Sequence, residues 1–110
     1  MIVSGRDAAN LDAAIASAEA RGAPSGSIGA ALLDVADTQA VALVGAAIQD
    51  RYERVDILVN SAGVNFAKRF WTDTDSATFA GVVAINLIGA AACTLAVLKG
   101  MQQRRRGTVI

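Results

Sequence analysis

Two asparagines are the side chains best suited to ligand chemistry in this sequence of 110 residues. Asn60 opens the stretch Asn-Ser-Ala-Gly directly after an apolar run, and Asn86 lies within a long apolar segment. A carboxamide donates and accepts hydrogen bonds, so either side chain can hold a polar group in place. Burying an amide without a partner costs about 1–3 kcal/mol, so we expect Asn86 to be hydrogen-bonded.

The composition excludes several kinds of chemistry. The chain has no histidine, which removes Ser-His-Asp and Cys-His catalysis and His-ligated metals. Its one cysteine, Cys93, excludes an internal disulfide framework and a Cys-cluster zinc site, so no metal site is expected. Ten basic and ten acidic residues balance, which argues against nucleic-acid binding. A hydrophobic content of 54% argues against disorder.

Short apolar segments alternate with helical patterns along the chain. Asp7 and Asp37 are suited to cap helices, and Gly22 and Gly107 to end them. The apolar run Val55–Val59 is typical of a strand buried on both faces. Strands are expected at Met1–Ser4, Ile28–Val35, Val55–Val59 and Thr108–Ile110, with helices at Ala8–Ala20, from Asp37 to Tyr52 and from Asp75 or Ser76 to about Gln103.

This alternation predicts an α/β protein, with a Rossmann-like parallel sheet and helices on both of its faces. The aromatic residues Phe66, Phe70 and Trp71 fall in an irregular segment, Val64–Thr74. They are suited to a pocket wall, to the core or to an interface.

One apolar segment also has the length and composition of a membrane span. The stretch Phe79–Leu98 is apolar enough to span a bilayer, and basic residues follow it. However, it is rich in Ala and Gly and carries the Asn86 amide, features that a buried helix of an α/β sheet explains better. No basic region precedes an apolar run at Met1, so no secretory signal is expected, and we expect a cytoplasmic protein without membrane contact.

Four motifs in this order resemble the short-chain dehydrogenase/reductase family. They are Val-Ser-Gly-Arg-Asp, Leu-Asp-Val-Ala-Asp, Val-Asp-Ile-Leu-Val-Asn-Ser-Ala-Gly and Ile-Asn-Leu-Ile-Gly. The resemblance covers essentially the whole chain, and its most specific element is Asn60–Gly63. It implies one partial NAD(P)-binding Rossmann domain over residues 1–110, an incomplete sheet lacking the first strand and the C-terminal half.

The resemblance also implies roles for individual residues. Arg6 would favour the 2′-phosphate of NADP, with NAD as the alternative cofactor, and Asp34 would contact adenine with Val35 beside the ring. Asn60, Ala62 and Gly63 would line the cofactor cleft, while Ser61 departs from the commoner second asparagine. Each position also has a plainer interpretation: a solvated arginine at Arg6, and turn residues at Asp34 and Asn60.

Asn86 would be the active-site asparagine, which positions a water in the proton relay, although a structural bond to neighbouring backbone is equally open. The family's glycine-rich phosphate loop and its catalytic Ser and Tyr-x-x-x-Lys pair are not found in these residues. The only tyrosine, Tyr52, has Asp56 four residues later.

The expected function is therefore that of a reductase fragment. In the complete protein, the reaction would be hydride transfer between NADP(H) and a small carbonyl or alcohol substrate. The fragment alone would be inactive and marginally stable, because strands on either side of the absent first strand would lose their shared neighbour. A homo-oligomer through the helix Asp75–Gln103 is expected. The alternatives are a non-catalytic interaction module and a membrane-anchored protein.

Overall fold

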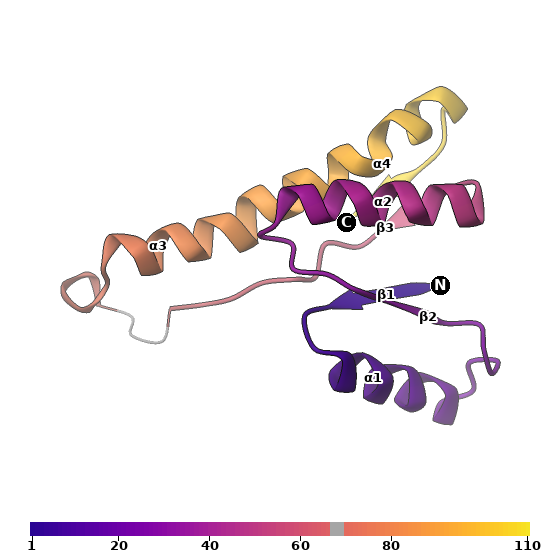
Figure 1. The fold of residues 1–110 in the computed structure, drawn as a ribbon, viewed down its shortest axis with the longest axis horizontal. Helices are drawn as coiled ribbons and strands as arrows, with labels where there is room; N and C mark the ends of the chain where they lie inside the picture. Colours follow the sequence, from indigo (N-terminus) through magenta and orange to yellow (C-terminus); the bar gives the residue numbers. More distant parts are fainter. Residues whose placement is uncertain (67–69) are drawn as a thin grey trace. The chain divides into compact units, whose positions relative to one another are not determined.

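The computed structural model describes residues 1–66 and 70–110 and has the expected α/β character, in which parallel strands alternate with helices (Figure 1). It consists of two compact units, Met1–Asp34 and Val35–Ile110. Residues 67–69 belong to the segment expected to be irregular and lie outside the described part.

The first unit contains β1 (Ile2–Gly5), α1 (Ala8–Ala20) and β2 (Gly29–Leu32). The two strands pair in parallel, with Ile2 opposite Gly29 and Gly5 opposite Leu32. As expected, Asp7 caps α1, because its Oδ1 accepts a hydrogen bond from the Asn10 amide at 3.0 Å. Behind the helix, Gly22 adopts a φ of 101°, which favours glycine. The buried side chains of this unit are Leu11, Ile28 and Leu33.

The second unit begins with α2 (Thr38–Tyr52), which Asp37 caps through the amides of Gln39 and Ala40. Its short strands, β3 (Ile57–Leu58) and β4 (Thr108–Val109), also pair in parallel. The helix α2 packs on α4 (Ala90–Arg104) around the buried side chains Val41, Val97 and Met101. Close approach depends on Gly45, where a Cβ would lie 2.9 Å from the Ala96 Cβ.

One long helix runs through the second unit in three pieces (Figure 1). It passes from α3 (Ser76–Val83) through the π-helical segment η2 (Ala84–Gly89) into α4. Asp75 caps its start, and the hydrogen bonds that its carboxylate accepts, first from the Thr78 backbone, lower the pKa of Asp75 below its usual value. The sequence predicted this helix but not the π-helical segment, which inserts extra backbone without breaking the helix.

Two expectations about local structure were wrong. The strand within Val55–Val59 is not buried on both faces, because Ile57 is 62% exposed and β3 has only β4 as a hydrogen-bonded neighbour among the described residues. The left-handed residue after α4 is Arg105, with a φ of 52°, and not Gly107. Glycine is required at Gly107 for another reason, since a Cβ there would overlap the Met101 side chain.

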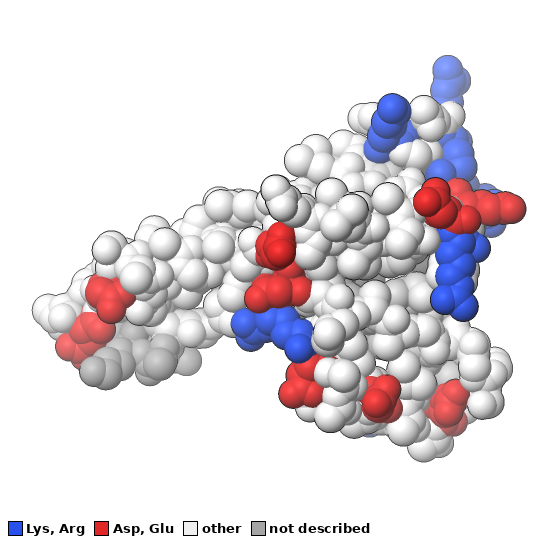
Figure 2. All heavy atoms as spheres, viewed as in Figure 1, with Lys and Arg blue, Asp and Glu red and all other residues white. Residues whose placement is uncertain are grey.

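The helix from Ser76 to Arg104 is long and apolar enough to cross a membrane, by length and composition alone. In Figure 2 the visible surface along α3 and η2 is uncharged apart from acidic side chains where the helix begins. A single helix of this kind is weak evidence for a membrane span, because core helices of soluble proteins have the same composition. Exposed apolar side chains of the helix include Leu87 and Leu95, both about two-thirds exposed.

Substitution of Gly89 tests a close contact between the long helix and Val35 in the second unit. A Cβ at Gly89 would lie 2.8 Å from the Val35 carbonyl oxygen, so Gly89→Ala should lower the free energy of unfolding by about 1–3 kcal/mol. Gly81→Ala is the matched control, because a Cβ there meets nothing within 4 Å and alanine favours a helix. Urea unfolding followed by circular dichroism should show Gly89→Ala less stable than Gly81→Ala; equal stability would contradict the described contact.

Candidate functional site

In the first unit, two of the expected site residues lie together where β1 and β2 end. The Arg6 Nη1 atom is 4.0 Å from the Asp34 Oδ2 atom, and both side chains are about half exposed. An exposed pair at this distance contributes little stability, about 0.2–1 kcal/mol, so a ligand can separate the two groups at low cost. The pair places a cation and a carboxylate at the carboxyl edge of the β1–β2 sheet.

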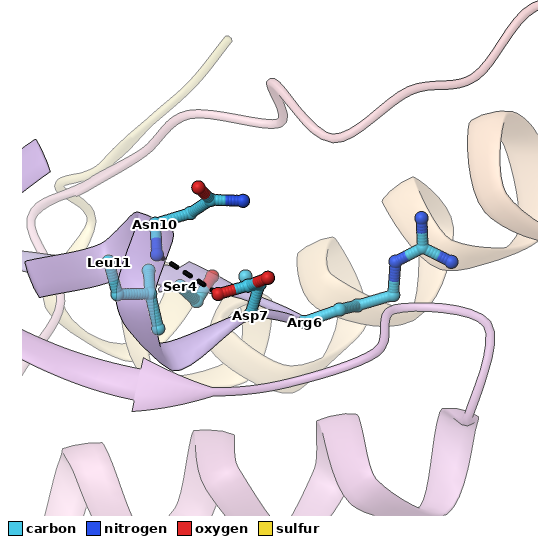
Figure 3. Close-up of a pocket in the computed structure, with 6 residues that line it drawn as sticks. Ser4, Arg6, Asp7, Asn10 and Leu11 are labelled. Atoms are coloured by element: carbon cyan, nitrogen blue, oxygen red, sulfur yellow. Dashed lines mark hydrogen bonds between the residues drawn. The ribbon is translucent and has the colours of Figure 1, made fainter. Parts of the chain in front are cut away.

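The same edge of the first unit holds a cavity of about 440 Å³ at the start of α1 (Figure 3). Asn10 supplies a polar side chain to the cavity, whereas the Arg6 side chain extends away from Asp7 and Asn10. The Asp7 carboxylate is turned to the helix, where it caps the Asn10 amide. The cavity is lined by Ser4, Gly5, Arg6, Asp7, Asn10 and Leu11.

In the second unit, the Asn86 carboxamide forms two hydrogen bonds with the backbone of Val64, one through its oxygen and one through its nitrogen. Asn86 Oδ1 accepts from the Val64 amide at 2.8 Å, and Asn86 Nδ2 donates to the Val64 carbonyl at 2.8 Å. The hydrogen bonds expected for Asn86 are present, and the partner is backbone, but the side chain is exposed and not buried as the sequence analysis assumed. Because Val64 follows Gly63 directly, these two bonds fix the end of the Asn-Ser-Ala-Gly stretch against the helix.

Asn60 lies four residues before Val64, and both its backbone and its side chain are hydrogen-bonded. Its amide donates to the Ile110 carbonyl at 2.7 Å, which extends the β3–β4 ladder to the strand end. Its Nδ2 atom is 3.4 Å from the Thr94 hydroxyl, a long hydrogen bond, and Thr94 in turn donates to the Ala90 carbonyl at 2.8 Å. Asn60 is half-buried.

Val35 is held by the same helix. A Cβ at Gly89 would lie within 3.0 Å of the Val35 side chain and carbonyl, so only glycine allows the helix to approach so closely. The helix therefore brings together, within one unit, three of the positions that the sequence identified: Val35, Asn60 and the chain after Gly63. Sequence reasoning missed Thr94 and Gly89, although Thr94 lies two helical turns beyond Asn86 and so on the same face.

The remaining candidates have simpler surroundings. Ala62 and Gly63 are exposed. Ser61 is exposed too, and its hydroxyl has no hydrogen-bond partner within residues 1–66 and 70–110. Among those same residues, no three His, Cys, Asp or Glu side chains gather as metal ligands would. Cys93 is half-buried, and burial raises the pKa of its thiol, which leaves it protonated and unreactive at neutral pH.

The aromatic residues divide into two kinds. Phe66 is half-buried and stacks on Phe79 with ring centroids 6.2 Å apart. Trp71 lies against the same ring at 6.0 Å but is 80% exposed, and Phe70 is also mostly exposed. Phe70 and Trp71 are therefore not core side chains. Of the three roles expected from the sequence, those in a pocket wall and in an interface agree with this exposure.

Comparison with known proteins agrees with the α/β fold. The family model for short chain dehydrogenases matches residues 1–110. The short-chain reductase protein NovJ of Streptomyces niveus is 32% identical over the whole chain, which spans 40% of that protein. The crystal structure of a short-chain dehydrogenase from Streptomyces avermitilis is 30% identical with a TM-score of 0.85, over 98% of this chain and 37% of that one.

A metagenomic short-chain oxidoreductase, solved in complex with NADP, has the same fold with a TM-score of 0.88 at 24% identity, over 98% of this chain and 48% of that one. The chain belongs to the short-chain dehydrogenase/reductase family. It spans less than half the length of these relatives.

Asn86→Asp tests the two hydrogen bonds between the Asn86 side chain and the Val64 backbone. The substitution replaces the donor that faces the Val64 carbonyl with an acceptor, so this hydrogen bond is lost and the repulsion between the two oxygens displaces the side chain from Val64. Amide hydrogen exchange at Val64 should then speed up by about tenfold, the effect of losing one to two net hydrogen bonds. Gln103→Glu adds the same charge to the same helix as a control. Unchanged protection of Val64 in Asn86→Asp would show that the side chain does not hold this loop.

Proposed function

We propose that this chain is the nucleotide-binding portion of an oxidoreductase that transfers hydride between NADP(H) and a small carbonyl or alcohol compound. The observation that carries the proposal is the Asn-Ser-Ala-Gly stretch, held against the helix by Asn86 at the carboxyl end of β3. Open α/β sheets bind their ligands at this edge. When bound, the cofactor supplies the hydride, and the chain supplies binding and orientation.

The described residues fit an adenine nucleotide with a 2′-phosphate. Arg6 offers an exposed guanidinium, and a guanidinium suits the bidentate recognition of a phosphate. The Asp7 carboxylate does not compete with a phosphate for Arg6, because it caps α1. Asp34 is suited to accept from the adenine amino group, and Val35 to contact the ring. We therefore propose NADP rather than NAD as the cofactor.

The second unit would take the ribose and nicotinamide part of the cofactor with Asn60, Ala62 and Gly63. Asn86 is the residue of the family's catalytic set that this chain carries. Because Val64 occupies both ends of its carboxamide, we assign the Asn86 side chain to positioning the loop. Proton transfer to the substrate would need the family's Ser, Tyr and Lys, and these 110 residues carry no Tyr-x-x-x-Lys pair. We expect no turnover by these residues alone.

The proposal extends to partners and location. The substrate would be a small molecule, and neither nucleic acid nor a membrane is needed. The exposed apolar residues Leu87, Ile88 and Leu95 support self-association through the helix of Asp75–Gln103. We also propose a cytoplasmic location.

Arg6→Ala tests the choice of cofactor. Loss of the guanidinium removes a charge-assisted bond to the 2′-phosphate, worth about 1.5–3 kcal/mol, so the dissociation constant for NADPH should rise about tenfold or more. NADH lacks this phosphate, and its binding should change little. The measurement is a fluorescence titration of the full chain with each nucleotide, with Lys99→Ala as a control that removes an equal charge from an exposed site. An equal loss for NADPH and NADH would contradict the assignment of Arg6.

A further inference from the structure

The Thr94 hydroxyl has a defined hydrogen-bond polarity. Thr94 Oγ1 donates its only proton to the Ala90 carbonyl at 2.8 Å, one helical turn earlier. A hydroxyl that has given away its proton can only accept from any further partner. The group that faces Thr94 from Asn60 must therefore be the Nδ2 donor, which is the atom found 3.4 Å away.

This polarity decides which end of the Asn60 carboxamide is available. With Nδ2 turned to Thr94, Oδ1 points to the other side of the planar amide group. No described residue donates a hydrogen bond to Asn60 Oδ1, and the backbone of Asn60 is already fixed through its bond to the Ile110 carbonyl. Asn60 is half-buried as a residue, and its unpartnered Oδ1 atom is accessible to solvent, so a ligand can reach it.

We propose that Thr94 is a positioning residue, which orients the Asn60 carboxamide so that Oδ1 stands as a fixed acceptor for a ribose hydroxyl of the dinucleotide. The inference rests on the proposed function and adds to it a residue on a helix face, outside the motifs that the sequence analysis identified. The 3.4 Å bond is long, and a ligand that pulls on Oδ1 would polarise the amide and strengthen the bond to Thr94.

The test compares two substitutions of Thr94. Thr94→Val keeps the shape of the side chain and removes the hydroxyl, whereas Thr94→Ser keeps the hydroxyl. In the full chain labelled with ¹⁵N, the Asn60 side-chain amide resonances should move in Thr94→Val and return close to their original positions in Thr94→Ser. A purely structural role of Thr94 in the helix would not produce this pattern at Asn60.

Binding of NADPH, titrated by fluorescence, gives the functional result. The dissociation constant should rise about threefold to tenfold in Thr94→Val, the equivalent of one net hydrogen bond, and be restored in Thr94→Ser. If the unmodified chain binds NADPH and Thr94→Val binds it equally well, the inference is overturned and the proposed function stands. If the unmodified chain does not bind NADPH, the proposed function fails and the ligand role of Thr94 fails with it. The Asn60 resonances would still show whether the two side chains are in contact.

Discussion

The second unit depends on the two hydrogen bonds between the Asn86 carboxamide and the Val64 backbone. Both are 2.8 Å long, and they join the middle of the long helix to the chain that leaves β3. The joint lies within the π-helical segment η2, whose wider turn ends at Gly89. The segment η2 also determines the orientation of Gly89 and of α4. The contacts of Gly89 with Val35 and of Thr94 with Asn60 therefore depend on the position of η2.

The packing of α2 on α4 keeps this helix in position. The contact is close because Gly45 meets Ala96, and because Gln49 Nε2 donates to the Ala96 carbonyl at 2.9 Å. The buried apolar side chains are few in each unit, so a small loss of packing is a large fraction of the total stability. The strands add little, because β1 pairs only with β2, and β3 only with β4, in the described part of the chain. Strand edges left this way are prone to pair with other chains.

The features that the sequence predicted well are those decided within a few residues. The helix at Ala8–Ala20, the caps at Asp7 and Asp37, and the long helix after Asp75 depend on local hydrogen bonds and on side-chain preference. Features decided by distant neighbours were harder. The burial of the third strand was overestimated, because an apolar run does not reveal how many strands lie beside it.

The site shows the same division. The sequence indicated that Asn86 needs a partner, but not that the partner is Val64, 22 residues earlier. It located Asn60 at a strand end, while the polarity of its amide depends on Thr94, 34 residues later. Such contacts appear only once the helix is docked. The pairing of Arg6 with Asp34 was likewise not predicted, since parallel pairing of β1 with β2 is what brings the two strand ends together.

Mapping NADPH binding on the ¹⁵N-labelled chain tests whether the loops held by this helix form part of a nucleotide site. We expect concentration-dependent shifts of the Val35, Asn60, Gly63 and Val64 amides. Amides at the far end of α4, such as Gln102 and Gln103, should stay in place. Shifts confined to that far end, or none at the four loop amides in saturating NADPH, would contradict the account.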